Sequence, residues 1–258
     1  MLPYLIVDLK LCNRTKIAYK LDEEALKNLN ILLESFANSV QSIPKDDISY
    51  YLKKYDGPKY TVDFKDNSSR KNLSFNELLS LSNAGSKEIV RLEADANLSF
   101  SEYNINIRLT NNMDFSSPVY YRFICNNEEL YYTYQAKITD FMDQIEQSKI
   151  YSKIRTNDFI FIYLVFIPIL LVILFTLASF GLEFLLLKIV NYNEFISLLL
   201  SVTLPILGIV IKNILLPAGE IHIGKGKERA ERFKSFRNFL LGTILFTLVV
   251  ELINSYRK

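Results

Sequence analysis

FIFIYLVFIPILLVILFTLASFGLEFLLLKIV, residues 159–190, is the stretch that decides the fold. It holds no charged residue between Phe159 and Leu182. A helix needs about 20 apolar residues to cross about 30 Å of hydrocarbon, and helices buried in soluble cores rarely run this far without a charge. The stretch therefore predicts a transmembrane helix.

Two more apolar segments follow, FISLLLSVTLPILGIVIKNILL at 195–216 and FLLGTILFTLVVELI at 239–253. The last one would reach only about 22 Å as a helix, at about 1.5 Å per residue. It can span a thinned bilayer or lie at the interface. We expect residues 158–258 to form an all-α transmembrane region of two to three helices, either three spans or a hairpin followed by an interfacial helix.

Basic residues between the second and third apolar segments predict the orientation in the membrane. Short loops rich in Lys and Arg stay on the cytoplasmic side. The N-terminus shows no signal-peptide pattern, because Asp8 breaks its short apolar run. We therefore expect a multi-pass protein of the cell membrane, with residues 1–157 and the basic segment 217–238 in the cytoplasm.

Residues 1–157 have the mixed composition of a globular domain. Alternating apolar positions predict strands, and apolar residues at helical spacing predict helices. Strands are expected over 4–11, 60–64, 88–94, 103–109 and 119–125, with 16–21 as a hairpin partner of the first. Helices are expected over 22–40, 74–81 and 131–154. This order predicts an α+β domain with a mainly antiparallel sheet packed on helices.

The sequence shows little sign of catalysis. It contains one histidine, His222, and no cluster of His, Cys, Asp or Glu at metal-ligand spacing. The formal net charge of +2 is too small to suggest bulk nucleic-acid binding. We predict a protein that is not an enzyme, has no cofactor or metal and does not bind nucleic acid directly. A less favoured alternative is an enzyme that acts on lipid or on the cell envelope, but the sequence shows no evident catalytic pair for such a reaction.

Polar residues at helical spacing occur inside the predicted spans. Small and hydroxyl residues can simply let helices pack closely, whereas charged residues inside a bilayer tend to face protein or water. The predicted membrane-interior polar residues are Ser197, Ser201, Lys212, Thr243, Thr247 and Glu251. In the three-span arrangement Lys212 lies near the cytoplasmic end of its span and Glu251 near the outer end of the next, so the two cannot pair within one protomer, which favours a homo-oligomer.

The basic segment is a second candidate site. Each basic residue near a membrane surface contributes roughly 1 kcal/mol of attraction to anionic lipid. The predicted lipid-binding residues are Lys225, Lys227, Arg229, Arg232, Lys234 and Arg237. The alternative is that they serve only as the ordinary positive anchor on the cytoplasmic side, and the two interpretations are compatible.

The segment that carries these residues begins with the pattern Pro217-x-Gly219-x-Ile221-x-Ile223-Gly224-x-Gly226. Followed by a basic helix and a last apolar segment, it resembles the end of uncharacterised prokaryotic membrane proteins with a soluble N-terminal domain. The overall plan is similar to that of membrane effectors of antiviral systems, including those paired with short prokaryotic Argonautes. The resemblance implies a cytoplasmic domain that docks an activating partner, binding to anionic lipid, and loss of membrane potential on activation.

These observations lead to one main hypothesis and one alternative. The main hypothesis is a non-enzymatic antiviral effector, in which the N-terminal domain binds a cytoplasmic protein partner and the helices then assemble and permeabilise the membrane. The alternative is a membrane anchor or adaptor that tethers a cytoplasmic complex.

Overall fold

The computed structural model describes most of the first 157 residues and a shorter segment near the C-terminus. The described residues are 9–15, 17–43, 55–99, 102–111, 117–157, 162, 212, 217–232, 234–236, 238–239 and 242. The chain divides into two compact units. Unit 1 comprises Met1–Ser152 and Ala218–Ala230, and unit 2 comprises Lys153–Pro217 and Glu231–Lys258.

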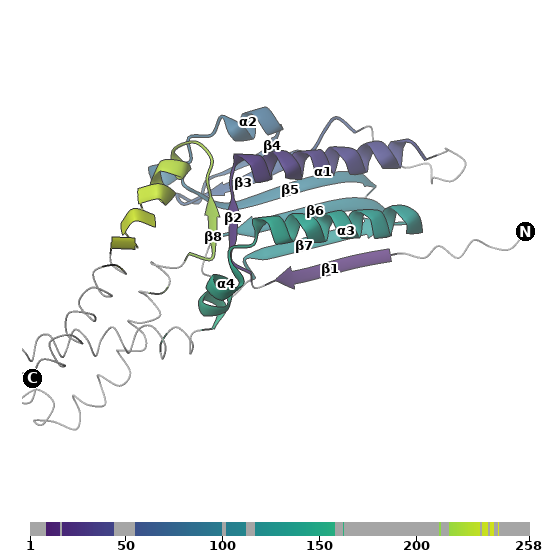
Figure 1. Cartoon of the computed structure of the whole chain (residues 1–258). Coiled ribbons are helices and arrows are strands. Elements are labelled where there is room, and N and C mark those ends of the chain that lie inside the picture. The colour runs from purple at the N-terminus through teal and green to yellow at the C-terminus, as the bar shows by residue number, and fades with distance from the viewer. Residues whose placement is uncertain are drawn as a thin grey trace, which may run out of the picture. The chain divides into compact units, whose positions relative to one another are not determined.

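A six-stranded antiparallel sheet forms the centre of unit 1 (Figure 1). Its strands lie in the order β1-β7-β6-β5-β3-β4. Their bounds are β1 Leu9–Thr15, β3 Lys59–Phe64, β4 Ser69–Leu73, β5 Ile89–Ser99, β6 Tyr103–Thr110 and β7 Val119–Cys125. The mainly antiparallel sheet that the sequence predicts is therefore present.

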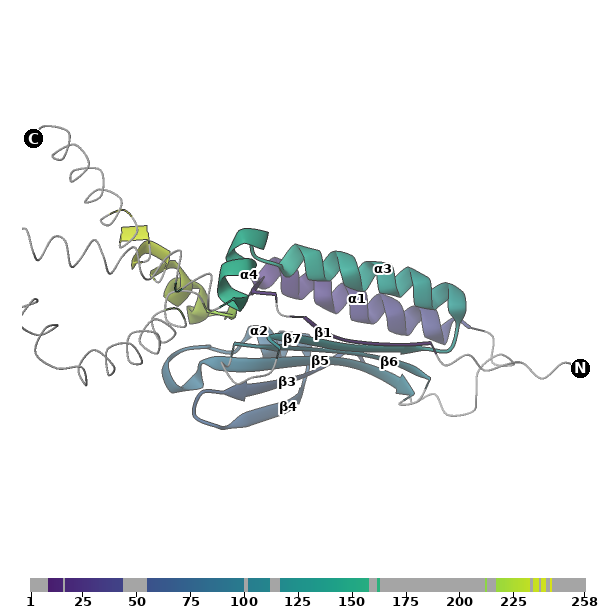
Figure 2. The same ribbon diagram turned by 90° about the horizontal axis from the view of Figure 1, so that it is seen from below.

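Two long helices, α1 (Glu23–Gln41) and α3 (Glu128–Ile145), lie side by side on one face of this sheet (Figure 2). Each begins at a side chain that satisfies a free backbone amide of the first turn. Asp22 accepts a hydrogen bond from the Ala25 amide at 3.1 Å, and Asn127 accepts one from the Leu130 amide at 3.0 Å. The helices bury one stripe each against the sheet and leave their charged faces outside.

Aromatic rings fill the space between helices and sheet. The Phe36 ring meets those of Phe123 and Tyr134 edge-on, with centroids 5.7 and 5.2 Å apart. This geometry suits the quadrupoles of the rings and adds to the burial of their apolar area. On β3, the Tyr60 hydroxyl donates to the Asn30 side-chain oxygen at 2.8 Å, so that the core also contains a satisfied polar pair.

Shorter elements surround this core. A capping box between Ser74 and Glu77 begins α2 (Phe75–Leu79), and a 3₁₀ turn, η2, covers Gly85–Lys87. The helix predicted over 131–154 is interrupted at Glu146, whose backbone is extended, and α4 (Lys149–Thr156) follows.

A second sheet has only two strands, β2 (Tyr19–Leu21) and β8 (Gly219–Ile221), which pair in parallel. The prediction that residues 16–21 form a hairpin with the first strand is therefore wrong. β8 comes from the segment predicted to lie at the membrane surface, yet Ile221 and Ile223 are buried within unit 1.

The prediction of transmembrane helices is contradicted. No helix among the described residues is both long enough and apolar enough to cross a bilayer. This finding corrects the all-α transmembrane region of two to three helices and the multi-pass cell-membrane localisation derived from it. The long helices that the structure describes, α1 and α3, are amphipathic and begin with acidic residues, so neither of them is a candidate span. The apolar runs 159–190, 195–216 and 239–253 lie almost entirely outside the described residues.

Candidate functional site

The face of the sheet opposite α1 and α3 is lined with polar side chains. Successive side chains of a strand point to opposite faces, so that every second residue faces away from the helices. On β5, Leu92, Ala94 and Ala96 are buried in the core, while the residues between them are half-buried on the other face. Figure 2 shows both long helices on one side of the sheet only, which leaves this second face open.

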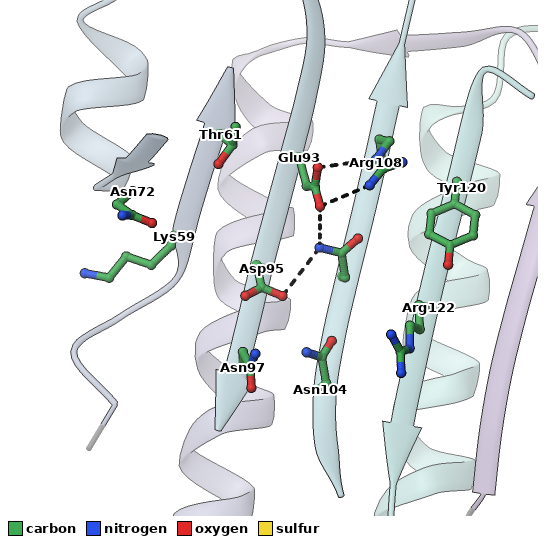
Figure 3. Close-up of a pocket in the computed structure, with 11 residues that line it drawn as sticks. Lys59, Thr61, Asn72, Glu93, Asp95, Asn97, Asn104, Arg108, Tyr120 and Arg122 are labelled. Carbon is green, nitrogen blue, oxygen red and sulfur yellow. Dashed lines mark hydrogen bonds and ion pairs between the residues drawn. The ribbon is translucent and has the colours of Figure 1, made fainter. Parts of the chain in front are cut away.

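Eleven residues of five strands line a hollow of about 340 Å³ on this open face, here called the polar trough (Figure 3). They are Lys59, Thr61, Asn72, Glu93, Asp95, Asn97, Asn104, Asn106, Arg108, Tyr120 and Arg122. Ten of them form three rows across the strands, because partners in register share a face. The rows are Thr61–Glu93–Arg108–Tyr120, Lys59–Asp95–Asn106–Arg122 and Asn97–Asn104.

Glu93 is the most heavily bonded group of the polar trough. Asn106 donates to it at 2.9 Å, and Arg91, on the same strand, donates at 2.6 Å. Arg108, its cross-strand partner, donates through two nitrogens at 3.3 and 3.4 Å. Partial burial raises the pKa of Glu93, but the hydrogen bonds from Asn106, Arg91 and Arg108 outweigh it and leave the pKa below its ordinary value. Glu93 therefore stays a carboxylate and is a poor proton acceptor at neutral pH.

The Asn97–Asn104 row lies at one end of the polar trough and is bonded quite differently. Both side-chain oxygens are shielded from solvent, and neither makes a hydrogen bond to any residue that the structure describes. Asn104 is only 5% exposed. A buried polar atom without a hydrogen-bond partner destabilises the fold by about 1–3 kcal/mol, because its lost hydration is not replaced by another hydrogen bond. Figure 3 shows the two amides side by side on β5 and β6.

At the opposite end of the polar trough, Arg108 lies over the ring of Tyr120, with 5.5 Å from its guanidinium carbon to the ring centroid. The exposed Cys12 thiol lies 3.4 Å from the Tyr120 hydroxyl, as a donor from the edge strand β1. This hydrogen bond, with a smaller contribution from burial, raises the pKa of Tyr120. The polar trough thus runs from a cationic and aromatic end to an end at which two amide oxygens have no partner among the residues described.

None of the predicted lipid-binding residues that the structure describes lines the polar trough. Lys225, Lys227, Arg232 and Lys234 are exposed, and Arg237 lies outside the described residues. Arg229 is half-buried, and its guanidinium forms an ion pair with Glu88 at 3.3 Å. Their binding to anionic lipid stays a prediction, although Arg229 has a structural contact of its own.

Of the predicted membrane-interior polar residues, only Lys212 is described. It is helical and 2% exposed. The others, Ser197, Ser201, Thr243, Thr247 and Glu251, lie outside the described residues. With one of the six residues described, whether they lie close together stays a prediction.

His222 lies beside Glu220, with its Nε2 atom 3.0 Å from the carboxylate. It is one of the residues that follow β8 and takes no part in the polar trough. Among the described residues, no group of three or more His, Cys, Asp and Glu side chains could hold a metal ion.

Sequence reasoning missed the polar trough. The sequence predicts strands over 88–94 and 103–109 from their apolar residues, and it assigns no role to the polar residues between them. The available signal was their chemistry: the outward positions of both strands carry Asn, Asp, Glu and Arg, which are depleted or unremarkable in strands, instead of Thr or Val.

No protein-family model, no curated protein and no solved structure matches the chain.

Proposed function

We propose that unit 1 is a non-enzymatic binding module and that the polar trough is the surface that receives its protein partner. The observation that carries this proposal is the pair of shielded amide oxygens of Asn97 and Asn104, which have no hydrogen-bond partner in the described part of the chain. Because both oxygens are shielded, a partner reaches them only when the two amides turn outward, and its donors then recover the hydration that folding has removed. The partner is expected to present donors such as backbone amides, hydroxyls or amines at this end.

The composition of the polar trough supports a polar partner over an apolar small molecule. Pockets for small molecules are mostly apolar, with a few polar groups that fix orientation. Here charged or amide side chains make up nine of the eleven lining residues, the exceptions being Thr61 and Tyr120. Arg108, Arg122 and Lys59 are interleaved with Glu93 and Asp95, so that a complementary surface needs both signs of charge. Such patterns contribute to the specificity and rate of association more than to affinity.

Binding rather than catalysis is supported by the state of the carboxylate at the centre. Glu93 is engaged by three donors that lower its pKa, and such a group is poorly placed to accept a proton in a reaction. The effector and adaptor hypotheses both begin with a partner docking on the N-terminal domain, and this proposal supplies a surface for that step. The later permeabilisation step depends on residues outside those described and stays a prediction.

The experiment is site-specific photo-crosslinking of the full chain, expressed together with the products of its neighbouring genes. A benzoylphenylalanine replaces either Lys59, at the rim of the polar trough, or Asn38, which is exposed on α1. The protein that crosslinks from position 59 is identified, purified separately and titrated against the full chain. We expect Asn104→Ala to weaken this binding about tenfold, which corresponds to about 1.4 kcal/mol.

Asn38→Ala is the matched control, because it removes the same side chain from the helical face. It should leave the dissociation constant within about twofold of the wild-type value, a change of about 0.4 kcal/mol. Equal crosslinking from positions 59 and 38, or binding that Asn104→Ala leaves unchanged, would rule out the polar trough as the docking surface.

A further inference from the structure

Residues 218–230 are far in sequence from the rest of unit 1, and they dock onto it as an extended segment followed by a helical turn, here called the docking segment. Backbone hydrogen bonds fix its register beside β2. The Tyr19 amide donates to the Ala218 carbonyl at 3.1 Å, and the His222 amide donates to the Leu21 carbonyl at 2.8 Å. β2 and this segment thus form a two-stranded parallel sheet of their own, in which main-chain hydrogen bonds hold the added strand.

Side chains of the docking segment pack closely against the rest of unit 1. Ile221 and Ile223 are 2% and 3% exposed and join the core cluster of unit 1. Gly219 lies directly against the ring of Tyr19, and a Cβ atom there would collide with that ring. Gly224 has φ +52°, and a Cβ atom there would lie 2.7 Å from the Leu81 carbonyl oxygen. The docking contacts thus require glycine at two positions and a bulky apolar side chain at two others.

Polar contacts complete the recognition. The Asn83 side chain is fully buried and bridges the two parts of unit 1: it donates to the Ile221 carbonyl at 2.8 Å and accepts from the Ile89 amide at 2.8 Å. The Lys225 amide donates to the Ser82 carbonyl at 3.0 Å, and Arg229 forms its ion pair with Glu88.

We propose that β2, residues 81–83 and Glu88 form a peptide-binding groove that recognises the pattern Gly-x-Ile-x-Ile-Gly, and that the docking segment occupies it reversibly. Every determinant lies within thirteen consecutive residues, so a separate peptide can present all of them. The strand pairing is only three residues long, and such short pairings are only marginally stable by themselves. This groove is separate from the polar trough, and the inference does not depend on the proposed function.

The test uses the full chain carrying Gly219→Val, which displaces its own docking segment from Tyr19. The probe is a fluorescent peptide with the sequence of residues 217–232, PAGEIHIGKGKERAER. We expect the peptide to bind this variant at least tenfold more tightly than the wild type, whose groove is filled. A peptide that itself carries Gly219→Val is the matched control and should not bind. Equal weak binding of both peptides to a variant that retains its circular dichroism spectrum would overturn the proposal.

A second measurement covers the case in which Gly219→Val fails to fold. Lys20 and Glu220 are partners in the parallel register, so cysteines at these two positions can form a disulfide when the strands pair. The full chain with Cys12→Ser and Lys20→Cys is mixed with the peptide carrying Glu220→Cys in the presence of oxidised glutathione, which accepts the two electrons. We expect a disulfide adduct to accumulate as the chain's own segment leaves the groove. Lys10→Cys, on β1, is the control position. No adduct at position 20, or the same yield at position 10, contradicts reversible occupancy.

Discussion

At the scale of single residues, two buried asparagines have opposite roles. Asn83 uses its side-chain oxygen and nitrogen in hydrogen bonds at 2.8 Å each, and Asn104 has an oxygen without a partner among the described residues. Burial alone does not distinguish them, since both are at least nine-tenths buried. Their effect on stability depends on whether the fold replaces the hydrogen bonds that water had made.

Asn83→Ala is expected to lower the free energy of unfolding by about 2–4 kcal/mol, because it orphans a buried amide and a buried carbonyl. Urea denaturation followed by circular dichroism measures the change. Asn76→Ala, at an exposed position of α2, is the control and should shift the free energy by less than about 0.5 kcal/mol.

Asn104→Val is expected to act in the other direction. It removes an unsatisfied oxygen and places a β-branched residue in a strand, which should raise the free energy of unfolding by about 0.5–1 kcal/mol. The same denaturation assay tests it. A loss of stability above about 1 kcal/mol would show that the side chain is already bonded within the fold.

Glu93 gives the fold a defined response to acid. Its folded pKa lies below the ordinary value of 4.5, so its stabilising contribution is complete above that pH and disappears as the pH falls through the folded pKa. Glu93→Gln should lower the free energy of unfolding by about 1.5–3 kcal/mol at pH 7 and by much less near pH 3. Denaturation at a series of pH values measures this, with the exposed Asp143→Asn as a control that shows no such trend. A pH-independent loss would mean that shape, not charge, matters at this position.

At the scale of elements, the packing of α1 on the sheet concentrates on Phe36. This ring is fully buried between Phe123 and Tyr134, so Phe36→Ala leaves a cavity that the surroundings fill only in part. We expect a loss of about 3–5 kcal/mol in the free energy of unfolding. Ile31→Ala on the same helix is the control: Ile31 is 60% exposed, and its truncation should change the free energy by less than about 0.5 kcal/mol. Similar losses of unfolding free energy in the two variants would show that Phe36 does not contribute more to the core than the exposed Ile31.

The elements with a strong local pattern are those that the sequence predicts well. The helical periodicity of α1 and the alternation of β3, β6 and β7 appear as expected. β4 has no such pattern: four of its five residues are exposed, so no apolar alternation marks it, and its sequence reads as a turn. The break at Glu146 also has no local cause, because the residue pairs with Tyr19 across the fold.

The candidate site was harder still to predict, for a geometric reason. Asn97 and Asn104 face each other only because β5 and β6 pair in one register, and a slip of one residue would turn one of them into the core. Likewise, β8 has three residues and meets β2 from the other end of the chain. Hydropathy describes each segment alone. It therefore predicts that the residues of β8 lie at a membrane surface, whereas their pairing partners lie in unit 1.

At the scale of the whole molecule, the Arg229–Glu88 ion pair links segments distant in the chain. Both side chains are partly exposed, so the coupling should be modest. A double-mutant cycle with Arg229→Met and Glu88→Gln is expected to give a coupling energy of about 0.5–1 kcal/mol in favour of the wild-type pair. Glu88 also meets Lys65 at 3.7 Å, and the cycle separates that contact from the one of interest. A coupling energy near zero would mean that the pair does not hold the docking segment in solution.

The place of β8 in the chain has a consequence for biosynthesis. A nascent chain leaves the ribosome from its N-terminus, so β2 emerges long before the strand that pairs with it. At about 5–20 residues per second, translation of residues 153–217 takes roughly three to thirteen seconds. During that interval the edge of β2 and the apolar surface that later covers Ile221 are exposed to water. Nascent unit 1 is therefore expected to be a chaperone client until its last strand has been synthesised.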